Sequence, residues 1–394
     1  MTLFRMELRK VLSVRLMAVA LVICALYIHL FVAQSVRLES KQHPAAEAQA
    51  WSHSAARDYG AEIDAQEFAK WQAQFEQLKQ DAAEKIAKTP ALGTMGFRTW
   101  DELMAALDGA SDAKSSRIYE ALRPAFFSPG DSVLGFQLQS QQHLLEQYGE
   151  IATHGWSKLQ GADQPSAVEA RLKQVVADGT WRSVQDPALT FDGPDYEARL
   201  AIAVLLAVLL VVSPMLVSDR VRRLRQLQYS TVTGRRLLTT QFFATITAGF
   251  FVSIVVTAAG LVPLARAIEP AMLGNSMSSF LVSYVYRSEW TQGGVVIATA
   301  ALVVLLGTAT SAVAFLLARF SRGFISLIVR LIVAFVLALF LCPYLLGAAF
   351  TFSNPLHMLI SFPGIETWCA VAFAALCAVS AFAVLRRERS VDCA

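Results

Sequence analysis

The feature that most constrains this chain is a set of six long apolar runs separated by polar segments. The runs cover residues 16–33, 200–217, 242–264, 295–317, 325–349 and 368–385. A helix needs about 20 apolar residues to cross a bilayer core, and each run is close to that length. The chain of 394 residues is 55% apolar and 16% charged, whereas a soluble domain has about 25% charged residues. We therefore expect an all-α membrane protein with six transmembrane helices.

Lysine and arginine gather at alternate ends of these runs, and this asymmetry predicts their orientation. The N-terminus, the segment between the second and third runs, the turn between the fourth and fifth, and the C-terminal tail are all basic, so the rule places both termini in the cytoplasm. We expect residues 1–15 to form a cytoplasmic interfacial amphipathic helix, residues 386–394 to form a cytoplasmic tail, and the protein to lie in the cell membrane, plasma or inner. A cleavable signal peptide at residues 1–35 is the competing interpretation, although Phe31 stands where cleavage needs a small residue.

The longest polar segment, residues 34–199, differs in charge from the rest of the chain. Residues 36–197 contain 15 Lys and Arg against 24 Asp and Glu, whereas the rest contains 19 against 7. Because the basic segments are expected inside, this acidic segment is predicted to be an extracytoplasmic domain inserted between the first two spans. It is long enough for a core of its own. It holds none of the five cysteines, so no disulfide framework is expected there.

This inserted segment is expected to be mainly helical. Apolar residues recur at spacings of three and four, as on one face of an amphipathic helix, at Phe68, Trp71, Phe75, Leu78 and Ala82. That face could pack in a core or form a partner-facing coiled coil. Further helices are predicted over 101–107, 111–122 and 136–160, and from Pro165 to Gly179. Residues 180–196 show no clear period, so either a strand or a loop is expected there.

Several motifs that carry chemistry are missing from the sequence. The chain has no Gly-Lys dipeptide and therefore no P-loop of its own, and it lacks G-x-S-x-G, H-E-x-x-H and G-x-G-x-x-G. The six histidines are far apart, and no His/Cys cluster suggests a metal. We therefore expect no catalytic residue, metal site or cofactor in this chain, and no nucleic-acid partner. A membrane enzyme such as an acyltransferase would need an intramembrane histidine with an acidic partner, which neither His29 nor His357 has nearby in sequence.

The segment at residues 218–241, predicted to be a cytoplasmic coupling loop, is the most informative stretch. It is too rich in arginine to enter lipid, yet Val221, Leu224 and Leu227 lie three residues apart and predict one face of a short helix. A cluster that only sets topology is one interpretation. Six arginines are more than orientation requires, which favours docking to a cytoplasmic protein.

This segment resembles the loop between the second and third spans of type-two ABC transporter permeases. In that family an acidic residue stands at the end of the second span. It is followed by a short polar helix, a turn of small residues, a basic pair and an apolar helix. The family often has a lysine where this chain has Gln241. The resemblance assigns the following residues to docking of an ATPase subunit: Asp219, Arg220, Arg223, Arg225, Gln226, Tyr229, Ser230, Gly234, Arg235 and Arg236.

The resemblance implies a non-catalytic permease subunit of an ABC transporter, with export as the expected direction. A separate nucleotide-binding ATPase subunit would bind ATP and magnesium, and a second permease subunit, identical or different, would complete the transport path. The subfamily implied has a large extracytoplasmic domain between spans 1 and 2, which could cap the exit, select the substrate or dock another protein. Residues 350–367 resemble the outer re-entrant segment of the family.

A few polar and helix-breaking residues near the runs are candidates for the pathway or its gating. They are Arg330, Pro214, Pro343, Asn354 and Pro355. Arg330 lies near the cytoplasmic end of its run, so it could instead extend toward the interface. The alternative function is a transmembrane signal or force transmitter, coupled to a cytoplasmic ATPase but without a transport pathway.

Overall fold

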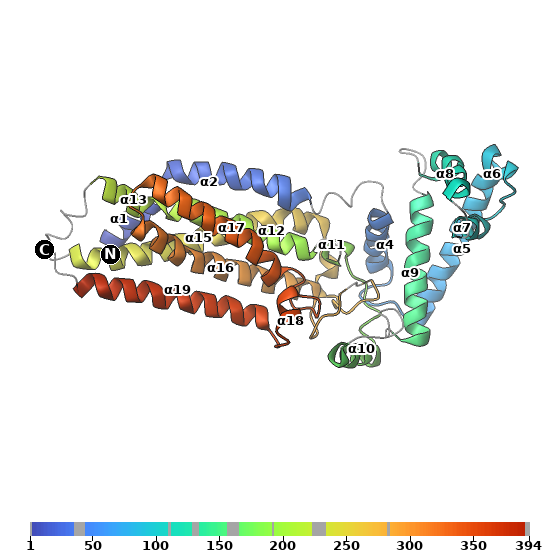
Figure 1. Cartoon of the computed structure of the whole chain (residues 1–394). Helices are drawn as coiled ribbons and strands as arrows, with labels where there is room; N and C mark the ends of the chain where they lie inside the picture. The colour runs from blue at the N-terminus through green and yellow to red at the C-terminus, as the bar shows by residue number, and fades with distance from the viewer. Residues whose placement is uncertain are drawn as a thin grey trace. The chain divides into compact units, whose positions relative to one another are not determined.

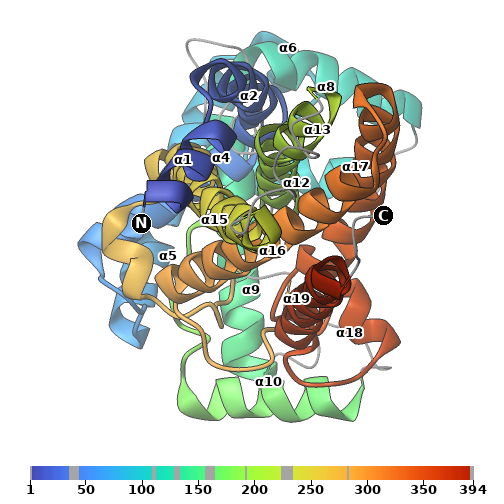
Figure 2. The same ribbon diagram turned by 90° about the vertical axis from the view of Figure 1, so that its left-hand side faces the viewer.

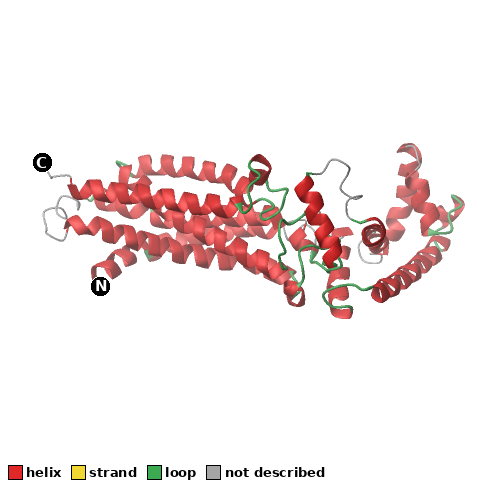
Figure 3. Ribbon diagram, turned by 90° about the horizontal axis from the view of Figure 1, so that it is seen from below, coloured by secondary structure: helices red, strands yellow, loops and turns green. Residues whose placement is uncertain are grey.

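The protein folds into two compact units, seen in a computed structural model (Figure 1). The structure describes residues 2–34, 44–108, 112–127, 134–155, 165–190, 193–222, 234–281 and 284–390. One unit, called the span unit below, comprises Met1–Val36, Asp192–Ala267 and Gly293–Ala394; the other, called the polar unit, comprises Arg37–Phe191 and Ile268–Gln292. The described residues form helices and no strand (Figure 3), although isolated antiparallel bridges join Glu62 to Ser183 and Arg182 to Ser279.

Six helices of the span unit are long and apolar enough to cross a membrane, which confirms the expected number. These stretches are Val14–Val32, Asp195–Val221, Leu237–Ala267, Gln292–Phe320, Phe324–Leu346 and Ile365–Arg387. They belong to α2 (Val14–Tyr27) with its π-helical continuation (Ile28–Val32), α12 (Gly193–Val212) with α13 (Pro214–Val221), α15 (Gly234–Ala267), α16 (Gln292–Phe320), α17 (Phe324–Leu346) and α19 (Ile365–Ser390). Two shorter helices, α1 (Thr2–Val11) and α18 (Pro355–Leu359), complete the unit.

The helix α12 is the most enclosed of the six. In its most apolar window 72% of the residues are buried, against 11% in α2 and in α17. Seen end-on in Figure 2, α12 lies among α2, α15 and α17, and it contacts all three. Ser213 interrupts the helix just before Pro214, which has no N–H to donate to the preceding turn. The break separates the central helix from α13, the last turns before the arginine-rich segment.

Close approach of α12, α15 and α16 depends on small residues. A Cβ atom added at Gly307 of α16 would overlap Ser253 Oγ of α15 and would lie 2.7 Å from Val204 Cγ1 of α12. Small residues let membrane helices pack with their backbones close together, because no hydrophobic force between helices operates in lipid. The remaining faces of the span helices are apolar and exposed, as expected where lipid is the surrounding solvent.

The polar unit is a set of helices whose positions largely follow the sequence pattern. Its helices are α4 (Pro44–Asp58), α5 (Ala65–Ala87), α6 (Pro90–Thr94), α7 (Trp100–Asp108), α8 (Asp112–Phe126), α9 (Leu134–His154), α10 (Ser166–Asp178), α11 (Pro187–Thr190) and a 3₁₀ turn (Pro270–Gly274). The last part of the helix expected over 136–160 lies outside the described residues. Residues 180–190 form bridges and the short helix α11, so the alternative of a strand is wrong there.

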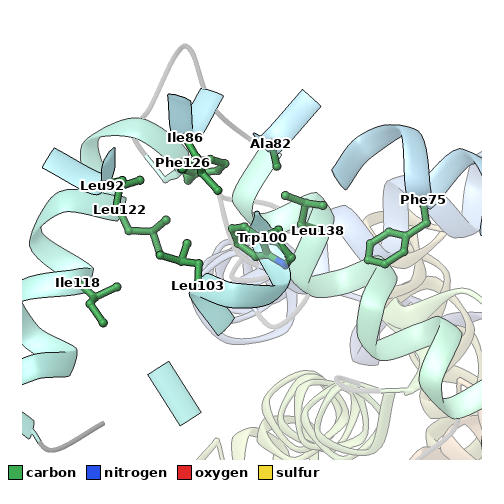
Figure 4. Close-up of a cluster of buried hydrophobic side chains, with 10 residues drawn as sticks. All are labelled: Phe75, Ala82, Ile86, Leu92, Trp100, Leu103, Ile118, Leu122, Phe126 and Leu138. Atoms are coloured by element: carbon green, nitrogen blue, oxygen red, sulfur yellow. The ribbon is translucent and has the colours of Figure 1, made fainter. Parts of the chain in front are cut away.

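The helix α5 shows why local sequence predicts these elements well. Asp64 accepts hydrogen bonds from the backbone N–H groups of Gln66 and Glu67, and the Glu67 carboxylate accepts one from the Asp64 N–H, each at 2.8 Å. This reciprocal cap satisfies donors that the first turn leaves free. The apolar face packs inward: Phe75 and Ala82 belong to a core formed with Trp100, Phe126 and further residues of α6 to α9 (Figure 4). Core packing, and not an exposed coiled coil, therefore explains the face.

A second cluster of the polar unit is aromatic. Trp51 stacks on Trp71 with ring centroids 4.2 Å apart, and Phe68 stacks on Tyr148 at 4.3 Å. The Tyr148 hydroxyl donates a 2.7 Å hydrogen bond to the Ile63 carbonyl. Burial raises the pKa of Tyr148 above its ordinary value, so its hydroxyl stays protonated to a higher pH than that of an exposed tyrosine. This bond ties α9 to the turn before α5.

Residues 268–292, which follow α15, belong to the polar unit and not merely to a short connection between two spans. The buried Arg171 of α10 donates to the Tyr286 carbonyl at 3.2 Å and to Ser278 Oγ at 3.3 Å, and it pairs with Glu289. Asn275 Nδ2 donates to the Val184 carbonyl at 2.7 Å. The polar unit is therefore assembled from two segments of the chain that are far apart in sequence.

Candidate functional site

A buried polar network joins α1, α13 and α15 at one end of the span unit. Gln241, in the second turn of α15, donates from Nε2 to Glu7 Oε2 and to Asp219 Oδ2, each at 3.1 Å. Glu7 is 2% exposed, and its other oxygen, Oε1, pairs with Lys10 Nζ at 2.6 Å. One amide therefore bridges two carboxylates from helices that are remote in sequence. Figure 1 shows α1, α13 and the start of α15 at the same end of this unit.

Arg220 extends the network to the turn between α16 and α17. Its guanidinium donates to the Arg319 carbonyl at 2.5 Å and to the Ser321 carbonyl. Carbonyls at the end of α16 lack partners within their own helix and carry the negative end of its dipole, so an arginine is well matched to them. Arg220 thus fastens α13 to the point where the chain turns from α16 into α17. We call Glu7, Asp219, Arg220 and Gln241 the end network.

The structure describes only part of the predicted docking set. Asp219 and Arg220 are half-buried in the end network, and Gly234 begins α15. Arg235 and Arg236 lie in the first turn of α15, but their side chains are outside the described residues. Five members of the set lie wholly outside the described residues, and their role stays a prediction: Arg223, Arg225, Gln226, Tyr229 and Ser230.

The candidate gating residues lie at helix breaks and helix ends. Pro214 begins α13, Pro343 lies in the last turn of α17, and Pro355 begins α18. Arg330 of α17 is partly buried and reaches back to the Leu317 carbonyl of α16 at 3.5 Å. This places its charge toward the end of α16 that carries the end network, consistent with an arginine that extends toward an interface.

Asn354 organises the connection from α17 to α18. Its side-chain amide donates to the Gly347 carbonyl at 2.8 Å, and its Oδ1 accepts from the His357 N–H at 3.0 Å as an N-terminal cap of α18. Phe350, which lies between Gly347 and Asn354 in the sequence, has a left-handed backbone with φ of 65°. Its N–H donates to Glu366 Oε1 at 3.2 Å, which holds this unfavourable conformation in place. The segment is thus a fixed structure and not a loose loop.

Sequence reasoning missed the partners of the predicted residues. Glu7 is the one acid within residues 1–15, and an acid isolated among arginines on an amphipathic helix is a signal that could have found it. Glu366, at the start of α19, gave no such signal. Glu197 of α12, which accepts a 2.8 Å hydrogen bond from Thr299 of α16, also stands near the end of a span. Each of these contacts joins residues that the sequence does not place together.

The end network is suited to transmitting motion between helices. The Gln241 amide joins the two carboxylates, and the neighbouring Arg220 guanidinium binds backbone carbonyls at the end of α16. These bonds connect four helices, so displacement of one helix is resisted by the others. Within the described ranges, no group of three or more His, Cys, Asp and Glu could hold a metal ion. Comparisons with models of protein families, with curated proteins and with solved structures found no match.

Proposed function

We propose that this chain is the membrane permease subunit of an ATP-driven exporter of the ABC type, with its ATPase on a separate chain. The observation that carries the proposal is the end network. The arginine-rich segment begins after Asp219 and Arg220 and leads into α15, and both of its flanks are bonded into the span unit through Gln241 and Arg220. A segment anchored in this way is suited to receiving force from a docked protein.

The proposed mechanism is a lever and not a chemical step. Closure of two ATPase subunits around ATP pushes on residues 220–236 of two permease copies. Because α13 continues into the enclosed helix α12, and Arg220 holds the turn before α17, the push tilts α12 and α17 together. A two-state rocking of packed helices then opens a path between the copies. Pro214 serves as the hinge, and the Asn354–Pro355 turn closes the far end.

The proposed orientation follows from charge. Arginines gather at the end of the span unit that bears α1 and α13, while the polar unit carries most of the acidic residues. With the positive end in the cytoplasm, both termini lie inside and the polar unit lies outside the cell membrane. There the polar unit is placed to cap the exit, select cargo or bind an extracytoplasmic protein.

Co-purification in mild detergent tests the docking. Wild-type chain is expected to bring down a nucleotide-binding subunit with a P-loop, and the double variant Arg223→Glu/Arg235→Glu is expected to lose it, because two repulsive charges replace two attractive ones at the contact. The variant Arg57→Glu/Arg98→Glu, with the same charge change in the polar unit, is the matched control and should retain the subunit. A well-folded wild type without any such ATPase would contradict the proposal.

The alternative of a signal or force transmitter shares the same docking. It is favoured by the polar unit, whose two clusters of packed side chains give it a core of its own. The two functions separate in a reconstituted complex. An exporter moves cargo across the vesicle membrane when ATP is hydrolysed, whereas a transmitter changes the conformation of the polar unit without moving cargo.

A further inference from the structure

The span unit contains an apolar cavity that lies within its spanning helices. The cavity measures about 390 Å³ and is lined by residues of α12, α16, α17, α18 and α19. Figure 2 shows α17, α18 and α19 on the same side of α12, and these three helices contact one another. Its volume falls in the range of small-molecule sites, roughly 300–1,000 Å³.

The lining determines which chemistry the cavity accepts. Among the described residues, no charged side chain lines it. The Thr310 hydroxyl, one of its few polar groups, is already used in a 2.8 Å hydrogen bond to the Leu306 carbonyl one turn earlier. A polar or charged ligand would therefore lose its hydration without gaining partners. The cavity suits a purely hydrocarbon group.

The cavity is elongated along the helices. On α17 its lining runs from Ala334 to Leu345, a rise of about 16 Å at 1.5 Å per residue. At one end it reaches Leu356 of α18 and Cys369 at the start of α19. Exposed aromatic residues at this end, Tyr344 and Trp368, are of the kind that gathers at the membrane–water boundary. The long axis thus runs from the middle of the spans toward an interface, as a lipid tail does.

The cavity is also open to the surrounding bilayer. Its inner wall is buried, with Leu306 and Ala338 among the residues of the core, whereas Leu337 and Leu341 on its rim are more than half exposed. A hydrocarbon chain can therefore enter sideways between helices, without passing through water. From this geometry we infer that the cavity is a binding site for one acyl chain of a membrane phospholipid, whose headgroup stays at the interface beside α18. The inference does not depend on the chain's being a transporter.

Photolabelling from the acyl chain tests this site. The full chain is reconstituted in phosphatidylcholine vesicles containing a trace of phosphatidylcholine with a diazirine near the end of one acyl chain. Lipid on the outer surface labels Leu21 and Val22, which are exposed on α2. Only a tail inside the cavity reaches the buried Leu306 and Thr310 of α16. Wild type is expected to carry label at both places.

Variants distinguish the cavity from adventitious surface lipid. Leu337→Trp narrows the mouth at an exposed position, where a larger side chain disturbs little packing, and should abolish the label on Leu306 and Thr310 while leaving that on α2. Ala18→Trp, on the exposed face of α2, is the matched control and should change neither. Ala338→Trp fills the inner wall and should act as Leu337→Trp does. Label confined to exposed residues in wild type, or label on Leu306 or Thr310 that survives Leu337→Trp, would overturn the inference.

Discussion

Replacing Gly307 by alanine is expected to destabilise the span unit by about 1–3 kcal/mol, the usual cost of forcing an extra group into a packed core. The new Cβ would overlap Ser253 Oγ and lie 2.7 Å from Val204 Cγ1. Ser253 is held by its 2.7 Å hydrogen bond to the Gly249 carbonyl, and Val204 is fully buried, so neither can withdraw. The helices α12, α15 and α16 must separate instead. The measurement is the unfolding midpoint of the full chain in detergent.

Two further variants separate this clash from the intrinsic effect of the substitution. Gly149 lies inside α9 of the polar unit, and a Cβ atom there meets nothing within 4 Å. Gly149→Ala should therefore stabilise its helix, by about 0.5–1 kcal/mol, since alanine loses less conformational freedom on folding. Gly307→Ala combined with Ser253→Gly should recover part of the loss. Unchanged stability in Gly307→Ala would show that the three helices are not packed as described.

Replacing Gln241 by leucine is expected to cost about 1–3 kcal/mol, the penalty for leaving a buried polar group without its partner. Leucine is similar in size but cannot donate to Glu7 or Asp219, and the Glu7 carboxylate then keeps Lys10 as its partner among the described side chains. Because Gln241 hydrogen-bonds α15 to α1, hydrogen exchange should accelerate in α1 more than elsewhere in the span unit. Amide exchange resolved by peptide is the direct measurement.

Lysine at the same position provides the contrast. Gln241→Lys keeps a donor between the two carboxylates and adds a positive charge, so α1 should remain protected from exchange and the unfolding midpoint should not fall. If leucine and lysine behaved alike, the loss would reflect packing and not the hydrogen bonds of the end network. If leucine matched wild type, the network would have no part in holding α1.

The spans could be predicted because apolar length is a property of consecutive residues. The same holds for the buried face of α5, where Trp71, Phe75 and Ala82 recur with the helical period, and for the left-handed Gly179 that ends α10. Helix ends were less exact: α17 ends at Leu346 although the apolar run continues to residue 349. There Pro343 and the Asn354 hydrogen bonds, and not hydropathy, determine where the helix stops.

Contacts between distant residues could not be predicted in this way. Gln241 and Glu7 are 234 positions apart in the sequence, and Arg171 and Glu289 are 118 positions apart. No periodicity relates such pairs, because each is selected by the final packing of helices and by the need to satisfy a buried polar group. The assignment of residues 268–292 to the polar unit was missed for the same reason. The docking role of Arg223 and Arg225 remains a prediction from charge and from the family resemblance.

The central claim is that the arginine-rich segment contacts an ATPase, and site-specific photocrosslinking tests it most directly. The photoreactive residue p-benzoylphenylalanine is placed in cells at Tyr229, within the segment, and in a second strain at Tyr119, an exposed residue of α8 in the polar unit. The account predicts an adduct at Tyr229 with a protein that carries a P-loop and binds ATP, and no such adduct at Tyr119. Reaction at Tyr229 with lipid or water alone, in cells where the chain is folded and inserted, would contradict it.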